Sequence, residues 1–390
     1  MTDSKKTKSF SSDMTGAAVL SGTAGALIAV LDSVLVNGFG SVSVTGLAVA
    51  SSVATATVAA GHSFKVGSVA LVAGATPSGL NGEKRVLAVA SNTFTFDATG
   101  ISDGSATGTI TAKVAAAGWT KQYTGTNIAV YKMGGVEGTG FVLRVDDTGT
   151  TVARVRGYEA MSDANTGTGP FPTTAQWADS GLWWSKSNAA SAAARPWRIV
   201  ADDRGFFYFC KQADTGAEHQ GNYFGDFLSL KSNDPYACVL RANTDSRISN
   251  TSAFTDGLEY MDSSLIYDGL YVARAANTLG GAQKHHQYPA TAVALSLQHV
   301  TGAAGRPYPS PVDNGLMLTP VVLYTSAGYR GYFPGISVSP QITNDSFSTG
   351  DVIAGSGAMA GKSVTVVKLG APVAGSGQGV VFMDQTSDWR

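Results

Sequence analysis

The sequence predicts a mainly β protein, and three features of its patterning and composition predict it. Short β-branched and aromatic runs alternate with Gly, Asn-Gly and Asp-Gly turn signals, as in antiparallel hairpins. Only five of the 28 acidic residues are Glu, and Asp favours turns where Glu favours helix interiors. Hydrophobic residues make up 44% of the chain, enough to build a core. We expect an N-terminal helix, a small antiparallel β-barrel and then a larger antiparallel β-sandwich-like region.

Residues 1–40 are expected to form an N-terminal tail and helix. A polar, flexible start at residues 1–13 precedes the helix, which we expect over residues 16–36 because apolar residues recur there at three- and four-residue steps. Asn37-Gly38 then gives a helix stop signal. The helix packs either on its own protein or on a neighbouring subunit. Its apolar run is too short and too rich in Gly to cross a membrane, so no membrane insertion is expected.

Residues 41–113 are expected to form the small β-barrel module. Five short β-rich runs lie there between turn signals, at residues 54–58, 68–72, 85–89, 93–96 and 108–111. Phe94 and Phe96 alternate with polar neighbours, so one face of that strand carries both aromatic rings. We expect these two rings to anchor a core that folds on its own.

The same residues resemble a small β-domain that recurs in tail and baseplate proteins of tailed bacteriophages. The matching positions are 54–58, 61–62, 67–69, 74–75, 80–82 and 93–96. The sequence departs from the pattern at Ser63-Phe64, where Gly-Leu is usual, and at Ser68 in place of Asp. The resemblance implies a virion structural protein, assembled in the host cytoplasm, whose partners are copies of itself in a ring or trimer and other virion proteins.

Residues 119–390 are expected to form the larger β-rich region, as one domain or two. Aromatic and charged residues become more frequent from Trp119 onward. Two hairpins are predicted, one turning at Asp146-Asp147 and the other at Asp202-Asp203, because Asp-rich turns there separate pairs of apolar runs.

The reactive arrangements of common enzyme classes are missing from the sequence. It has no nucleophile elbow, P-loop, dinucleotide-binding glycine pattern or metalloprotease helix motif. Cys210 and Cys238 are expected to be free thiols, and the adjacent His285 and His286 would point to opposite faces of a strand. We therefore expect no enzyme, with no catalytic residues, no cofactor and no metal.

Two other groups could carry function. The pairs Asp146-Asp147 and Asp202-Asp203 could act as acids on a glycan, but turn chemistry explains both. Trp183, Trp184 and Trp197 could stack on a sugar, but core or interface packing is the simpler interpretation.

Charge excludes one class of partner. The net charge is −1 and no long basic run occurs, so no nucleic acid is expected as a partner. The leading hypothesis is a structural protein of a phage tail or baseplate. The alternative is a receptor-binding protein that contacts a host-surface glycan or protein, or one that decorates the capsid. A polysaccharide depolymerase is a weaker third hypothesis, since no β-helical repeat is visible.

Overall fold

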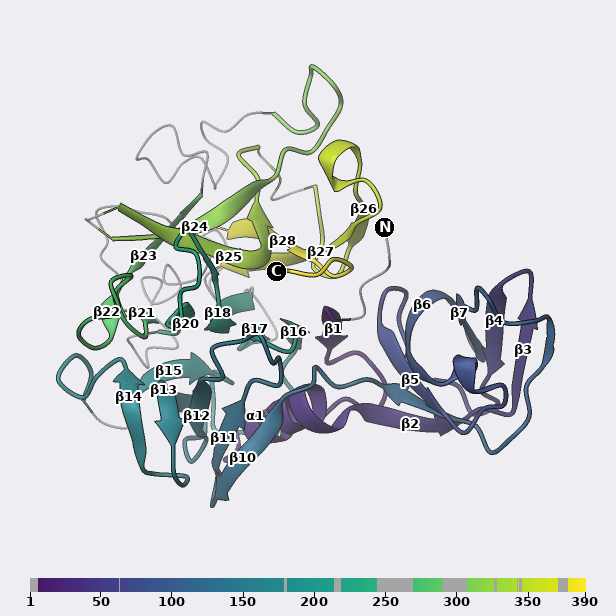
Figure 1. The fold of residues 1–390 in the computed structure, drawn as a ribbon, viewed down its shortest axis with the longest axis horizontal. Helices are drawn as coiled ribbons and strands as arrows, with labels where there is room; N and C mark the ends of the chain where they lie inside the picture. Colours follow the sequence, from purple (N-terminus) through teal and green to yellow (C-terminus); the bar gives the residue numbers. More distant parts are fainter. Residues whose placement is uncertain are drawn as a thin grey trace.

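Three β-sheets make up most of the described chain, so the mainly β class is confirmed. The computed structural model describes residues 6–62, 64–178, 181–213, 219–243, 269–289, 307–325, 328–341, 343, 346–370 and 378–390. Figure 1 shows a body built from two of the sheets, with the third forming a smaller unit that projects from one side.

The projecting unit, which we call the small module, is one eight-stranded antiparallel sheet. Its order is β2-β9-β5-β6-β7-β4-β3-β8, and the sheet curls around its own core (Figure 1). Its strands are β2 Phe39–Ser43, β3 Gly46–Ala50, β4 Val53–Thr57, β5 Val69–Ala73, β6 Gly82–Ala90, β7 Thr93–Asp97, β8 Gly104–Ser105 and β9 Thr111–Val114, with a short 3₁₀ turn at Ser78–Leu80.

The closed barrel that we expected is formed only in part, because β2 and β8 remain as edge strands. The edge strand β8 has two residues, and the segment around it contains Gly100, Gly104 and Gly108, all at positive φ. Such a segment turns repeatedly and offers too few residues to close a ring. The predicted alternation of β7 is confirmed: Phe94 and Phe96 are fully buried.

A six-stranded antiparallel sheet follows the small module. Its order is β10-β11-β12-β13-β14, with β15 also paired to β13. Its strands are β10 Thr120–Gly125, β11 Ile128–Lys132, β12 Val142–Asp146, β13 Val152–Met161, β14 Gly167–Phe171 and β15 Leu182–Ser185. The hairpin predicted at Asp146-Asp147 is confirmed as β12 and β13.

The third sheet has fourteen strands, and its described path runs β1-β16-β17-β18-β27-β28-β25-β24-β23. Its strands are β1 Lys8–Ser11, β16 Trp197–Ala201, β17 Gly205–Lys211, β18 His219–Asp226, β19 Leu228–Ser229, β20 Cys238–Arg241, β21 Leu270–Val272, β22 Gln283–Lys284, β23 His286–Pro289, β24 Thr319–Thr325, β25 Gly328–Val338, β26 Val352–Ala354, β27 Ser363–Gly370 and β28 Gln378–Asp384, with a 3₁₀ turn at Gly357–Met359. The hairpin predicted at Asp202-Asp203 is confirmed as β16 and β17.

We predicted a flexible start for residues 1–13. This prediction is wrong for residues 6–13, which the structure describes. Strand β1 pairs antiparallel with β16, and Phe10 is almost fully buried. A single apolar residue among polar ones gives no periodic signal, and the partner strand lies far along the chain. Local patterning therefore could not identify β1.

The helix predicted over residues 16–36 is much shorter than expected. The α-helix α1 spans Ala26–Leu31, and a π-helical turn, Asp32–Asn37, continues it. Before it, Gly25 has a φ of 80°, and a Cβ on Gly22 would lie 1.9 Å from the carbonyl oxygen of Ala189. This close approach to a distant loop holds the preceding segment out of a helix.

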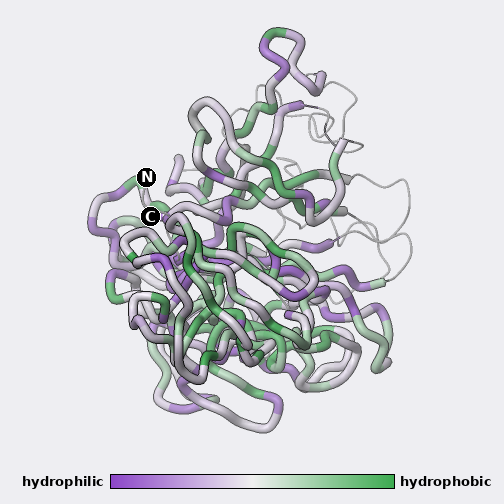
Figure 2. The backbone as a smooth tube through the Cα atoms, turned by 90° about the vertical axis from the view of Figure 1, so that its right-hand side faces the viewer, coloured by the Kyte–Doolittle hydropathy of each residue, from purple (hydrophilic) through white to green (hydrophobic). Residues whose placement is uncertain are grey.

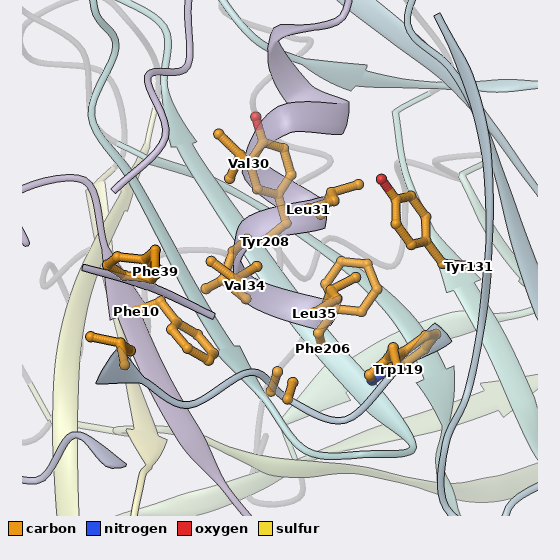
Figure 3. Close-up of a cluster of buried hydrophobic side chains, with 14 of the residues drawn as sticks. Phe10, Val30, Leu31, Val34, Leu35, Phe39, Trp119, Tyr131, Phe206 and Tyr208 are labelled. Atoms are coloured by element: carbon orange, nitrogen blue, oxygen red, sulfur yellow. The ribbon is translucent and has the colours of Figure 1, made fainter. Parts of the chain in front are cut away.

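The helix packs inside its own protein, as one of the two interpretations proposed. Leu27, Leu31, Val34 and Leu35 are fully buried in a cluster that contains side chains of all three sheets. Figure 3 shows Leu31 and Leu35 among aromatic rings that include Tyr131 from the six-stranded sheet. Figure 2 shows hydrophobic stretches in both halves of the molecule, many of them in the lower half, at the level of α1 in Figure 1. The apolar face of this helix is therefore not available to a neighbouring subunit.

Polar contacts attach the small module to the body. The guanidinium of Arg85, a buried residue of β6, donates to the carbonyl oxygens of Gln385 at 2.9 Å and Thr7 at 3.3 Å. Beside it, Lys8 of β1 pairs with Glu83 of the module at 2.8 Å. These contacts hold the module against the first and last described strands of the body.

The core of the small module gives a direct test of its packing. Phe94→Ala and Phe96→Ala should each lower the free energy of unfolding by about 3–5 kcal/mol, because each removes a fully buried ring. Leu87→Ala is the matched control, since Leu87 lies on the same sheet but is 48% exposed, and it should change stability by about 0.5 kcal/mol or less. Urea unfolding measures all three. Equal effects of the three substitutions would contradict the assigned core.

Candidate functional site

The first predicted carboxylate pair is divided between two structural tasks. Asp146 accepts hydrogen bonds from the backbone and hydroxyl of Thr148, as expected for a turn. Asp147 is fully buried, and its Oδ2 accepts the N–H groups of Leu27 at 2.7 Å and Ile28 at 3.1 Å. It therefore caps the start of α1 from a different part of the chain, where the helix dipole favours a negative charge.

Lys186 completes this buried site. Its ammonium donates to Oδ1 of Asp147 and to the carbonyl oxygens of Thr23 at 2.8 Å and Gly149 at 2.7 Å. Both charged side chains are 0% exposed. Burial raises the pKa of Asp147, and the Lys186 ammonium and two backbone N–H donors partly offset that rise. All three ammonium hydrogens are used, so this pair has a structural role.

The second predicted pair lies at a small hollow of the body. Asp202 is buried, and its Oδ1 accepts the backbone N–H groups of Arg204 at 2.8 Å and Gly205 at 2.7 Å, which is the predicted turn chemistry. Its Oδ2 forms an ion pair with Arg390. Burial raises the pKa of Asp202, with the Arg390 charge opposing the rise.

The hollow itself has a volume of about 120 Å³ and is lined by three segments, residues 135–137, 202–204 and 388–390, together with Lys6. Its buried acid, Asp202, is already paired with Arg390, whereas Glu137 is exposed. This geometry binds the three segments together. Asp203 and Asp388 also line the hollow, but its buried carboxylate, Asp202, is held by Arg390 and is not a free acid of the kind that glycoside cleavage requires.

Of the three tryptophans that could stack on a sugar, two belong to the core. Trp184 is 0% and Trp197 is 1% exposed, and each indole N–H donates to a backbone carbonyl. Trp183 is half-buried, and the guanidinium of Arg154 lies 3.3 Å from the centre of its ring. A sugar therefore cannot reach Trp184 or Trp197 in this structure, and Arg154 covers one face of Trp183.

The cysteines are free, as predicted, and both are fully buried. Burial raises the pKa of Cys210 to about 12 and that of Cys238 well above its usual value, which makes both thiols unreactive. His285 is buried, with Nδ1 3.0 Å from the carbonyl oxygen of Gln283. The side chain of His286 lies outside the described part, so the predicted opposition of the two rings stays a prediction.

Within the described residues, no group of three or more His, Cys, Asp or Glu side chains is placed to hold a metal ion. Searching the helices of that same part of the chain found none long and apolar enough to span a membrane.

One side of the small module has an unusual surface composition. The strands β8, β3, β4, β7 and β6 present one side to the exterior, and their register aligns residues in rows across the sheet. We call this side the outward face; it consists of Ser105, Ala48, Ala50, Val53, Thr55, Thr57, Thr93, Thr95, Asp97, Ala88 and Ala90, all exposed or half-exposed. Asp97 is the one charged residue among them, whereas about a quarter of residues in soluble proteins are charged.

Sequence reasoning missed Lys186, Arg390 and the outward face. The first two are single charged residues whose partners lie far along the chain, so no local pattern marks them. The outward face did have a signal: the alternate positions of β3, β4 and β7 are uncharged apart from Asp97. Compared with known proteins, this chain matches no protein-family model and no curated protein.

Breaking the buried ion pair should be costly. Lys186→Met should lower the free energy of unfolding by about 3–5 kcal/mol, because Asp147 would keep a buried charge without its cation. The matched control is Lys65→Met, since Lys65 pairs with Asp13 at the surface, with side chains 53% and 58% exposed, and its loss should cost about 1 kcal/mol or less. Chemical denaturation measures both. Similar losses in the two variants would contradict the structural role of the buried pair.

Stability should fall in mild acid partly because of His219. Burial lowers the pKa of this side chain from 6.5 to about 3, so the folded protein stays unprotonated there while the unfolded chain takes up a proton below pH 6.5. As pH falls from 6.5 towards 3, His219 should therefore remove stability, on the order of 1 kcal/mol per pH unit. His219→Gln should flatten the change in unfolding free energy between pH 7 and pH 5. If the unfolding free energy of His219→Gln depends on pH as in the wild type, the loss of stability in acid comes from other groups and the prediction is wrong.

Proposed function

We propose that this protein is a structural component of a bacteriophage particle, in the tail or baseplate, that works through contacts with copies of itself and other virion proteins. The observation that carries the proposal is the outward face of the small module, exposed and almost uncharged. Charged residues are depleted at the centres of protein–protein interfaces, so a face with one charged residue among eleven is suited to such a contact. The sequence resemblance of the module to phage tail domains points in the same direction.

The finer architecture belongs to the same proposal. The small module is a barrel-type unit with an open side, and the body is a sandwich-like pair of layers with α1 between them. In support, the largest core cluster contains Tyr131 and Val145 of the six-stranded sheet, Phe206 and Tyr208 of the fourteen-stranded sheet, and the helix residue Leu31. A rigid body with a projecting module is an arrangement suited to assembly contacts.

A receptor-binding role is the alternative function, favoured by one observation on the body. Val136 is 100% exposed and lies at the hollow next to the exposed acid Glu137. A fully exposed apolar side chain gains free energy when a partner buries it, which is the contact that this alternative requires. The outward face has the larger set of residues, so assembly remains the leading function.

Quantitative mass spectrometry of purified phage particles tests the proposal. We expect the protein in each particle in a copy number divisible by three, because tail and baseplate parts are built on threefold or sixfold axes. Particles made without the protein should lack complete tails. Complete tails that fail only to adsorb to cells would support the receptor-binding alternative, and absence of the protein from purified particles would contradict both functions.

A further inference from the structure

We propose that the hollow of the body beside Asp202 is a binding site for a primary amine with an oxygen acceptor close to its ammonium group, as in an amino acid or the N-terminal residue of a peptide. Arg390, the last residue, lines this hollow, so the label C in Figure 1 marks its place. Such binding goes beyond the proposed assembly function and does not depend on it. Three features of the hollow support it: its excess charge, a buried donor without an acceptor, and walls that are already fixed.

The hollow carries more negative than positive charge. Its lining contains three basic and four acidic side chains, which are Lys6, Arg204, Arg390, Glu137, Asp202, Asp203 and Asp388. Arg390 pairs with Asp202, and Arg204 pairs at 3.0 Å with the buried Asp226, which adds a fifth acid. Five acids against three bases leave two negative charges without a counterion. The hollow therefore attracts a cation.

Asp203 and Glu137 are the two acids that remain available. In the described part of the chain, neither side chain has a hydrogen-bond or ion-pair partner. Asp203 is half-buried and Glu137 is exposed, so both carboxylates can meet a ligand that enters from solvent. Among the same described residues, no group of three His, Cys, Asp or Glu side chains is placed to hold a metal ion. The cation that suits two carboxylates here is an ammonium group, which donates hydrogen bonds to both.

A buried donor in the hollow requires an acceptor. The two terminal nitrogens of Arg390 bond to Asp202, to the hydroxyl of Tyr223 at 3.1 Å and to the carbonyl oxygen of Asp226. Its Nε is also buried, in a side chain that is 10% exposed, but has no hydrogen-bond partner among the residues that the structure describes. An unpaired buried N–H group costs stability, and a ligand oxygen would satisfy it. The ligand therefore combines an ammonium group with an oxygen acceptor.

The walls of the hollow are fixed before a ligand arrives. The carbonyl oxygen of Asp203 accepts the N–H groups of Gly134 at 3.0 Å and Gly135 at 3.1 Å. A Cβ on Gly135 would lie 3.0 Å from Cγ of Asp203 and 2.5 Å from Cγ of Arg204, so the two segments are closely packed. A site that is already ordered loses less conformational entropy when it binds.

The size of the hollow limits the ligand to a small group. Its volume is about 120 Å³. A water molecule takes up about 30 Å³ of the liquid, so this volume suits several non-hydrogen atoms, such as the ammonium end of one amino acid. A ligand with so few atoms should bind in the millimolar range.

Four small probes test this site in ligand-detected NMR titrations of the full chain at low salt. Alanine amide has both the ammonium group and the oxygen, and it should bind in the millimolar range. Ethylamine lacks the oxygen and should bind about tenfold more weakly, because Nε of Arg390 then stays unpaired. N-acetylalanine amide lacks the charge and should not bind measurably. Free alanine is the fourth probe and distinguishes an amino acid from a peptide.

Three variants locate the binding. Asp203→Asn should weaken binding of alanine amide about tenfold, because it removes the half-buried carboxylate. Glu137→Gln should weaken it about threefold, at an exposed position that does not threaten folding. Asp103→Asn is the matched control, since this exposed acid of the small module lies outside the hollow and its loss changes the net charge equally. Thermal unfolding first verifies that all three variants fold like the wild type.

Equal weakening by Asp203→Asn and Asp103→Asn would overturn the site, because net charge alone would then explain the binding. So would a folded wild type that does not bind alanine amide, or one that binds ethylamine as tightly, since Arg390 would then contribute no contact. Alanine that binds as tightly as its amide would support a site for free amino acids, and binding of the amide alone would support a site for peptide N-termini. None of these outcomes depends on whether the protein is found in phage particles.

Discussion

The buried pair of Lys186 and Asp147 is the interaction on which the rest of the structure depends. A charge without water is tolerated only where each of its polar groups has a partner. Lys186 satisfies this condition with three acceptors from the turns before α1 and between β12 and β13. Asp147 satisfies it with the first N–H groups of α1. The helix is thereby fixed on the six-stranded sheet, and its apolar side chains fill the centre of the core.

The same use of charge explains the unusual surface. Only 14% of the residues are charged, and several of them lie inside as ties between distant segments. Arg85 joins the small module to the body, and Asp202 with Arg390 joins the β16–β17 turn to the last residues. Arg330 pairs with Asp234 with only 6% and 1% of their side chains exposed. Because several of the few charged residues form ion pairs in the interior, fewer remain for the surface. A face of the small module without Lys, Arg or Glu is therefore consistent with a chain of low charge content.

Local rules predicted the parts of the fold that local rules determine. The two hairpins were predictable because the Asp side chains of a turn accept hydrogen bonds from nearby backbone N–H groups, whatever surrounds the turn. The burial of Phe94 and Phe96 was predictable because successive side chains of a strand point to opposite faces. The helix was predicted too long because Gly22 and Gly25 lie against distant parts of the chain, Gly22 against the backbone of Ala189 and Gly25 against the side chain of Asn127. Lys186 and Asp147 are 39 residues apart, and Arg390 and Asp202 are 188 apart. No spacing rule joins such partners, so the sites they form had to come from the structure.

The pairing of β1 with β16, and of Arg390 with the β16–β17 turn, has a consequence for how the protein is made. Strands of the small module pair only with one another among the described residues, all within residues 39–114, so this strand pairing is complete early during synthesis on the ribosome. The body has a much higher contact order. Strand β1 can pair only after β16 has been synthesised, and Asp202 can form its ion pair only after Arg390 has been added. Chains rich in such distant contacts fold slowly. A ribosome that stalls or terminates early would therefore release a chain with a formed module and an open core, the kind of species that chaperones bind.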